Sequence, residues 1–408
     1  MSNSSSQSFV VIGAGHAGGR AVEAMRANGF EGAIHLIGAE QMVPYERPPL
    51  SKEMLVDSGV DCPPMHPAEF YTDKDITLHL GVTATDIDGD IRVVKNSDGT
   101  QLSYDQLLLC GGGQVRHLAV PGAELANIHT LRTIGDSNAI ETLLVPGNSI
   151  VIIGGGFIGL EVASAAKSRG CTVTVIEAAD RLMGRALPLE IGETFAALHR
   201  HHNVDIRLNT GVERFTGDTA VREVITTSGD SVPADGVIVG IGVDPGVTLA
   251  QTGNLEVNNG VVVDEFCRTS DPYIYAAGDV TFHFNPLLGR HVRLESWQNA
   301  QNQAIAAAAN MCGANTVFAE IPWFWSDQFG VNLQMSGAPD VWDDIAIRGN
   351  LSGRDGILFQ LNEGKLVGAI SLNRPRDMRF IKRLMTAGKS PSRDALIDEA
   401  ITFRELLK

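Results

Sequence analysis

Two glycine-rich hexapeptides, GAGHAG at residues 13–18 and GGGFIG at residues 154–159, have the spacing of dinucleotide-binding motifs. In such a motif the first glycine makes a tight turn, the second lets the backbone approach a pyrophosphate, and the third lets the helix pack close to the strand. The pyrophosphate then accepts hydrogen bonds from the free N–H groups at the helix N-terminus. One copy is weak evidence, because ordinary strand–helix turns also match it. Two copies predict two bound dinucleotides and hence a redox enzyme.

A glutamate follows each motif about 20 residues later, where a carboxylate accepts hydrogen bonds from the ribose hydroxyls. These are Glu40 and Glu177. A carboxylate repels a 2′-phosphate, so Glu177 predicts a preference for NADH over NADPH, which the nearby Arg181 and Arg185 would soften. Solvated strand ends are the alternative for both glutamates, but the motif spacing favours ribose ligands.

The elements that must position these motifs are readable from the sequence. Apolar runs at 9–12 and 150–153 predict strands that enter the two motifs, and helical stretches continue to about Asn28 and Arg169. Each motif therefore lies between a strand and a helix, which is the context that dinucleotide binding requires.

Further segments indicate additional parts of the fold. The short runs 76–78 and 91–94 predict a small antiparallel excursion, and the strand 106–109 leads into a glycine cluster at 110–113 that suits a domain crossing. From about residue 321 the sequence is rich in Trp and Phe and ends in a helix, which predicts a third domain.

Composition narrows the possible functions. The net charge of −16 argues against nucleic acid or an anionic membrane as partner. The N-terminus lacks the pattern of a signal peptide and no apolar run approaches the length of a membrane helix, so we expect a cytoplasmic protein.

The five cysteines are scattered through the sequence. Their spacing argues against a redox dithiol, an iron–sulfur centre and zinc, and predicts small buried thiols in a reducing compartment. The run at 199–202, HRHH, is interpreted as a solvated helix end rather than a metal site.

The motifs GAGHAG, YERPPLSKE, GGGFIGLEVA, YAAGDV, ESWQNAQNQ and PWFWSDQF occur in this order across essentially the whole chain. The sequence thereby resembles the FAD-dependent NADH:ferredoxin reductases of Rieske dioxygenase and cytochrome monooxygenase systems, the putidaredoxin reductase-like family. The resemblance implies an α/β fold of the glutathione reductase-like superfamily. Two Rossmann-like domains would bind FAD (1–113 and 246–320) and NAD (114–245), and 321–408 would form a C-terminal α+β interface domain.

The resemblance also assigns roles to single residues. Lys52 would lie beside flavin N5 with Glu161 as its ion-pair partner, and its charge would favour the reduced ring; these two are the catalytic candidates. Asp279 would accept a hydrogen bond from a ribityl hydroxyl, and Trp325 is either an aromatic beside the flavin or a core residue of the third domain. The implied cofactor-binding positions are Gly13, Gly15, Ala17, Gly18, Ala39, Glu40, Arg47, Lys52, Ala84, Arg132, Gly278, Asp279, Trp297, Gly154, Gly156, Ile158, Gly159, Glu161, Glu177, Arg185, Ile241 and Gly242; no metal ligand is implied.

Two positions depart from the family pattern. The crossing reads CGGGQVR at 110–116 instead of ATG followed by x-x-Pro-Arg, which removes one hydroxyl contact to FAD. His16 stands inside the first motif where an apolar or amide residue is usual, and we interpret it as a solvated or locally hydrogen-bonded side chain.

The predicted activity is hydride transfer from NADH to FAD, followed by single-electron transfer to a two-iron ferredoxin of Rieske or vertebrate-adrenodoxin type. Rubredoxin or monodehydroascorbate reductase and a non-enzymatic apoptosis-inducing-factor-like protein are the alternatives. The basic run 374–383 is either the ferredoxin dock or a solvated helix face. The identity of the ferredoxin and oxygenase stays open, as does the choice between monomer and homodimer.

Overall fold

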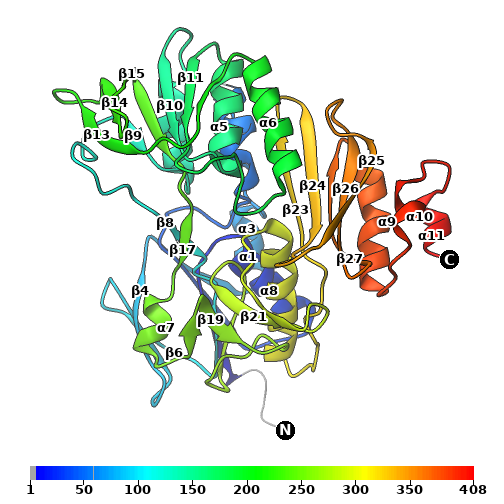
Figure 1. Cartoon of the computed structure of the whole chain (residues 1–408). Coiled ribbons are helices and arrows are strands. Elements are labelled where there is room, and N and C mark those ends of the chain that lie inside the picture. Colours follow the sequence, from blue (N-terminus) through cyan, green and yellow to red (C-terminus); the bar gives the residue numbers. More distant parts are fainter. Residues whose placement is uncertain (1–5, 58) are drawn as a thin grey trace. The chain divides into compact units, whose positions relative to one another are not determined.

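The computed structural model describes residues 6–57 and 59–408, and the contacts divide the chain into two discontinuous units (Figure 1). Unit 1 comprises Met1–Glu46, Pro63–Gln114 and Asp244–Phe324. Unit 2 comprises Arg47–Cys62, Val115–Val243 and Trp325–Lys408. The chain leaves unit 1 within β8 (Gly113–Val115) and returns within β17 (Val243–Pro245), at the crossing that the glycine cluster indicated. The assignment of three domains with cofactor roles stays a prediction.

Unit 1 is built on a five-stranded parallel sheet. Its strands are, in sheet order, β20 (Ile274–Ala276), β7 (Gln106–Leu109), β1 (Ser8–Ile12), β2 (Ala33–Gly38) and β3 (Ile76–Leu80). Residues 9–12 of the central strand β1 are all apolar and buried, and Val10 and Val11 are 0% exposed. Such a run is typical of a parallel sheet that is covered on both faces. The helices are α1 (His16–Ala27), α3 (Ala68–Asp73), α7 (Thr248–Thr252) and α8 (Trp297–Met311), and α1 packs on α8.

Smaller sheets complete unit 1. Their strands are β4 (Ala84–Asp88), β5 (Val93–Asn96) and β6 (Gln101–Ser103) in one, and β18 (Val257–Asn258), β19 (Gly260–Val263), β21 (Thr281–Asn285) and β22 (Arg290–Val292) in the other. The first of these is the predicted antiparallel excursion. The placement of residues 76–78 in that excursion is wrong, because they lie in β3 at the parallel edge of the main sheet. An edge strand is half exposed, so it alternates like an antiparallel strand.

Unit 2 contains a second five-stranded parallel sheet. In sheet order its strands are β12 (Asp205–Arg207), β11 (Thr172–Ile176), β10 (Ser149–Ile153), β16 (Gly236–Val239) and β9 (Ile128–His129). An antiparallel sheet accompanies it, with β13 (Val212–Thr216), β14 (Glu223–Thr226) and β15 (Ser231–Pro233). The helical segments are η2 (Pro48–Ser51), a 3-10 turn, α2 (Glu53–Val56), α4 (Ile134–Leu143), α5 (Phe157–Ser168) and α6 (Leu189–His201).

The C-terminal part of unit 2 is a sheet with helices, as the Trp- and Phe-rich sequence after residue 321 and its final helix predicted. In sheet order the strands are β23 (Trp323–Gln328), β24 (Val331–Gly337), β27 (Lys365–Leu372), β26 (Asp355–Asn362) and β25 (Asp344–Asn350), and the helices are α9 (Pro375–Thr386), α10 (Arg393–Ile397) and α11 (Phe403–Leu406). Helix α9 packs on β24 and β27. The predicted fold class is therefore confirmed: two Rossmann-like folds and a C-terminal α+β part.

The interpretation of residues 199–202 as a solvated helix end is wrong for the first histidine of the run. His199 is 0% exposed, and the ring of His202 stacks on Phe329 with a centroid distance of 4.0 Å. The end of α6 is covered by the segment after β23, which the helix sequence alone does not reveal.

Four of the five cysteines are buried, as expected, and Cys312 is half-buried. Among the residues that the structure describes, none of the helices combines the length and apolarity needed to cross a bilayer.

Candidate functional site

The first glycine motif has the geometry that a pyrophosphate needs. Gly13 has a φ of +110°, and a Cβ on it would lie 2.3 Å from the carbonyl oxygen of Cys110. A Cβ on Gly18 would lie 1.9 Å from the carbonyl oxygen of Gly13. Only glycine fits either position, and Gly15 ends the turn as the N-cap of α1. The N–H groups of the first turn of α1 therefore stand at the mouth of a tight loop.

The turn that carries Gly278 and Asp279 packs against this motif. A Cβ on Gly278 would lie 3.3 Å from the Cβ of Ala17 and 3.7 Å from that of Ala300. The backbone N–H of Gly278 donates to the side-chain oxygen of Gln303 over 2.8 Å. The structure thus brings the motif, the YAAGD turn and α8 together within unit 1, with Asp279 half-buried beside them.

His16 is the one sequence interpretation in this motif that is wrong. It is neither solvated nor locally hydrogen-bonded: it is 7% exposed, and its ring lies 4.9 Å from the ring of Trp297. Neither ring nitrogen has a hydrogen-bond partner among residues 6–57 and 59–408. Burial, with a contribution from Arg20, lowers the pKa of His16 to about 4, so its ring is neutral at pH 7. An unsatisfied buried ring at a helix N-terminus fits a site completed by a phosphate-bearing cofactor.

The remaining positions proposed for FAD in unit 1 follow β2 of the parallel sheet or begin β4 of the small antiparallel sheet. The Glu40 carboxylate accepts a hydrogen bond from the Tyr45 hydroxyl over 2.6 Å. Ala39 is exposed beside it after β2, and Ala84 is half-buried at the start of β4. Glu40 is thus held by a buried tyrosine from the proline-rich loop rather than left as a free strand end.

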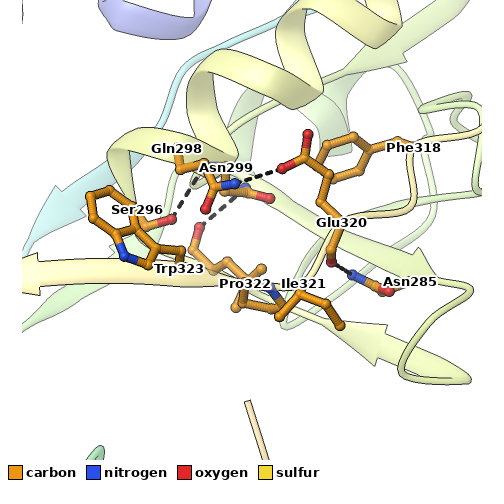
Figure 2. A pocket seen from close by; sticks show the side chains of 10 residues that line it. Asn285, Ser296, Gln298, Asn299, Phe318, Glu320, Ile321, Pro322 and Trp323 are labelled. Carbon is orange, nitrogen blue, oxygen red and sulfur yellow. Dashed lines mark hydrogen bonds between the residues drawn. The ribbon is translucent and has the colours of Figure 1, made fainter. Parts of the chain in front are cut away.

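The N-terminus of α8, where Trp297 stands, is fixed by a carboxylate from a distant segment. Figure 2 shows a small cavity under this helix end, with Gln298 and Glu320 among the residues that line it. Gln298 donates to the Glu320 carboxylate over 2.6 Å, and Asn302 donates to it over 2.8 Å. Because the two amides lie one turn apart on α8, Glu320 holds the first turns of the helix in place. Apart from its position before the PWFWSDQ motif, nothing in the sequence singles out Glu320.

The second glycine motif repeats the geometry of the first. Gly154 has a φ of +105°, and a Cβ on it would lie 2.5 Å from the carbonyl oxygen of Gly240. A Cβ on Gly159 would lie 2.3 Å from the carbonyl oxygen of Gly154. At Gly156, the N-cap of α5, a Cβ would meet no atom of the described residues within 4 Å. The first and third glycines pack closely, while the second faces open space, as a site for a pyrophosphate requires.

The side chains proposed to contact NAD gather around this motif. One oxygen of Glu177 accepts the N–H of Gly155 over 2.6 Å, and the other accepts the N–H of Ala179 over 2.7 Å. The Arg185 guanidinium lies 3.4 Å from the carbonyl oxygen of Ile241 and close to Gly242. Ile158 is 45% exposed on the first turn of α5. The backbone of the motif therefore holds the acidic side chain in the place where a ribose is expected.

Lys52 and Glu161 form an ion pair within unit 2. The Lys52 ammonium lies 3.1 Å from a carboxylate oxygen of Glu161 and 5.7 Å from the ring centroid of Trp325. Glu161 is 2% exposed and Lys52 has a side-chain exposure of 16%. The charge of Lys52 is thus held by a buried carboxylate on one side and an aromatic face on the other.

Two serines that the sequence analysis missed complete this pair. The Ser51 hydroxyl donates to one oxygen of Glu161 over 2.5 Å, and the Ser326 hydroxyl donates to the other over 2.6 Å. Both serines belong to recognised motifs, YERPPLSKE and PWFWSDQF. The hydrogen-bond acceptor of a serine cannot be predicted from its sequence position, so neither serine was identified as a site residue.

Arg47 and Arg132 are also brought together in unit 2. A guanidinium nitrogen of Arg47 donates to the carbonyl oxygen of Arg132, and the backbone N–H of Arg132 donates to Asp136 over 2.9 Å. The loop that carries Arg132 is fixed by Asp136 in the capping box of α4.

Comparison with protein families gives two adjoining matches. The family described as "Pyridine nucleotide-disulphide oxidoreductase" matches residues 7–304, and that described as "Reductase C-terminal" matches residues 323–407. Together they span both glycine motifs and the C-terminal sheet.

Individual relatives resemble the chain over almost its whole length. The ferredoxin–NAD(+) reductase component of the anthranilate 1,2-dioxygenase system of Burkholderia cepacia is 42% identical over 405 residues, which are 99% of this chain and 100% of the relative. Rhodocoxin reductase of Rhodococcus erythropolis is 42% identical over 380 residues, 93% of this chain and 89% of the relative. The solved covalent putidaredoxin reductase–putidaredoxin complex contains a chain that matches with a TM-score of 0.95 and 36% identity, and the match covers 98% of each chain.

Proposed function

The chain belongs to the pyridine nucleotide-disulphide oxidoreductase family, and we propose that it supplies electrons from NADH to a ferredoxin that feeds an oxygenase. It is an NADH-dependent oxidoreductase with FAD as its cofactor. The observation that carries the proposal is the pair of glycine motifs with matching geometry in one chain. When bound, FAD would supply the chemistry of the reaction, hydride acceptance from NADH and release of the electrons one at a time.

The chain's own residues then hold and orient the cofactors. We propose that the N–H groups of the first turn of α1 bind the FAD pyrophosphate, with Asp279 on the ribityl chain and Arg47 and Arg132 as further FAD contacts. The second motif and Glu177 bind NADH in the same way. Lys52 would face the flavin ring, where its ammonium, held by Glu161, would stabilise the negative charge of the reduced ring.

Steady-state NADH oxidation tests this function directly. We expect rapid turnover with a two-iron ferredoxin, and one FAD per chain in the purified yellow protein. A rubredoxin or monodehydroascorbate reductase would oxidise NADH fastest with rubredoxin or with the monodehydroascorbate radical. If NADH is oxidised with ferricyanide but not with ferredoxin, rubredoxin or the monodehydroascorbate radical, the result would support the apoptosis-inducing-factor-like alternative.

Nicotinamide specificity is expected to depend on Glu177. Glu177→Ala should raise the KM for NADH about tenfold by removing the ribose acceptor, and should narrow the discrimination against NADPH because the repulsion of a 2′-phosphate is gone. Glu213→Ala, which removes an exposed carboxylate from β13, is the matched control and should change neither constant. Equal use of NADPH and NADH by the wild-type enzyme would contradict this role.

We further propose that the partner is a two-iron ferredoxin, of Rieske or vertebrate-adrenodoxin type, that docks on α9. The helix buries Met378, Ile381 and Leu384 and exposes Arg376 and other basic side chains. Because ferredoxins are generally acidic and this chain carries a net charge of −16, encounter requires a local basic surface. Arg374 at the start of the helix is paired with Asp355. Further along α9, Arg376, Arg379 and Arg383 are exposed.

Reversing charge on α9 tests this dock. The double variant Arg376→Glu and Lys382→Glu should raise the KM for ferredoxin about tenfold and flatten its dependence on ionic strength, while turnover with ferricyanide stays intact. Arg222→Glu, an exposed position between β13 and β14, is the control. Equal losses with both acceptors would indicate damage to the flavin site instead.

The proposed function also implies roles for the domains, a cellular location and an oligomeric state. We assign FAD binding to 1–113 and 246–320, NAD binding to 114–245 and the partner interface to 321–408. A cytoplasmic location is supported by the five free thiols. A monomer or homodimer is proposed for the oligomeric state.

A further inference from the structure

A continuous chain of buried hydrogen bonds leads from α6 to the Lys52–Glu161 pair. The Ser326 hydroxyl lies 2.6 Å from a Glu161 oxygen, the Gln328 amide nitrogen lies 3.0 Å from the Ser326 hydroxyl, and the Gln328 amide oxygen lies 2.9 Å from Nε2 of His199. His199, Ser326, Gln328 and Glu161 are all between 0 and 2% exposed. Every link lies within unit 2.

The direction of this chain is fixed by its end at the carboxylate. The Glu161 carboxylate is ion-paired with the Lys52 ammonium and has no hydrogen to donate. The Ser326 hydroxyl must therefore be the donor in its hydrogen bond to Glu161. Ser326 is then the acceptor for the Gln328 amide N–H. The amide oxygen of Gln328 is left to face His199, which must donate from Nε2. All three hydrogens therefore point toward Glu161.

His199 is held in the form that such a donor requires. Burial lowers the pKa of His199 to about 4, with a smaller contribution from His202, so the ring is neutral at pH 7 and carries one hydrogen. The ring packs edge-on against Phe329 with a centroid distance of 4.9 Å. Nδ1 has no hydrogen-bond partner among the described residues, which leaves Nε2 as the nitrogen that uses the hydrogen.

His199 can affect Lys52 by setting the orientation of the Gln328 side-chain amide. If His199 did not donate to the amide oxygen of Gln328, that oxygen would be free to turn toward Ser326 and accept its hydroxyl hydrogen. Glu161 would then lose a donor on the oxygen that also pairs with Lys52. A buried carboxylate with one donor fewer holds its cation in a less defined place.

We propose that His199 and Gln328 are positioning residues for Lys52, acting through Ser326 and Glu161 to fix the ammonium that faces the flavin. This inference rests on the proposed function for one premise only, that Lys52 faces the flavin. It adds to the reaction two residues that lie on α6 and at the end of β23.

The first test reads the hydrogen on His199 and is independent of activity. In holoenzyme labelled with ¹⁵N-histidine, the resonance removed by His199→Gln should show a neutral ring with its hydrogen on Nε2 at pH 7. Gln328→Met should change the shift of that resonance. A hydrogen on Nδ1, or a resonance unaffected by Gln328→Met, would overturn the direction of the chain.

The second test reads the effect on the flavin. His199→Phe and Gln328→Met should each lower the FAD midpoint potential and slow its reduction by NADH about 3- to 10-fold, while the KM for NADH stays unchanged. His199→Gln, which replaces the ring Nε2–H by an amide N–H, should retain most of the wild-type rate. In a Lys52→Ala background, Gln328→Met should have no further effect on potential or rate.

Two results of the second test overturn the inference, for separable reasons. A full effect of Gln328→Met that persists without Lys52 would mean that the chain does not act through the ammonium. If Lys52→Ala itself left the potential unchanged while the histidine resonance behaved as expected, the proposed placement of Lys52 at the flavin would be at fault, and the effect on the flavin would fail with it.

Discussion

Lys52→Ala is expected to slow the reduction of bound FAD by NADH about 100-fold and to lower the flavin midpoint potential. The reason is the loss of a positive charge that a buried carboxylate holds in place at 3.1 Å, beside the ring of Trp325. Rapid-mixing measurements of flavin absorbance, together with a redox titration, check both quantities.

Two controls separate the charge from the fold. Lys95→Ala removes an exposed lysine, paired with Asp86, and should leave both quantities unchanged. Lys52→Arg retains a charge and should recover part of the rate. If Lys52→Ala reduces FAD at the wild-type rate and potential, Lys52 does not face the flavin.

Mild acid is expected to destabilise the folded protein strongly through three buried histidines. Burial is the main cause that lowers the pKa of His16, His199 and His283 from 6.5 to about 4. A neighbouring basic side chain lowers each pKa further: Arg20 acts on His16, His202 on His199 and His291 on His283. The unfolded chain therefore binds more protons between pH 6.5 and pH 4, so the free energy of unfolding falls as the pH drops through this window and is unaffected by these groups above it. At pH 5 the cost is about 2 kcal/mol for each histidine and about 6 kcal/mol for the three.

Thermal unfolding between pH 8 and pH 4.5 measures this loss. His283→Leu should flatten the pH dependence by about a third, since it removes one of the three titrating rings, whereas His201→Leu at an exposed position should leave the curve unchanged. A Tm that stays constant from pH 7 to pH 5 would show that these rings titrate normally.

The sequence alone was sufficient for the features that depend on neighbours along the chain. The two glycine motifs, the strands that enter them and the helices that leave them were predicted nearly to the residue, because turn glycines and apolar periodicity are local signals. The motif order was also enough to predict the family, since each motif is a short contiguous segment. Residues 76–78 show the limit of such signals: an edge strand of a parallel sheet alternates like an antiparallel strand.

Which side chains are buried, and which groups they contact, depends on how the elements pack in three dimensions. His16 looked like a solvated residue at a helix start, yet α8 closes over it through Trp297. His199 looked like the end of an exposed helix, yet it donates to Gln328 in a chain that ends at Glu161. These contacts join segments that are far apart in sequence, and a hydrogen-bond partner depends on which faces of the fold meet. Residue type and spacing therefore specify the elements, whereas burial and partners follow from their packing.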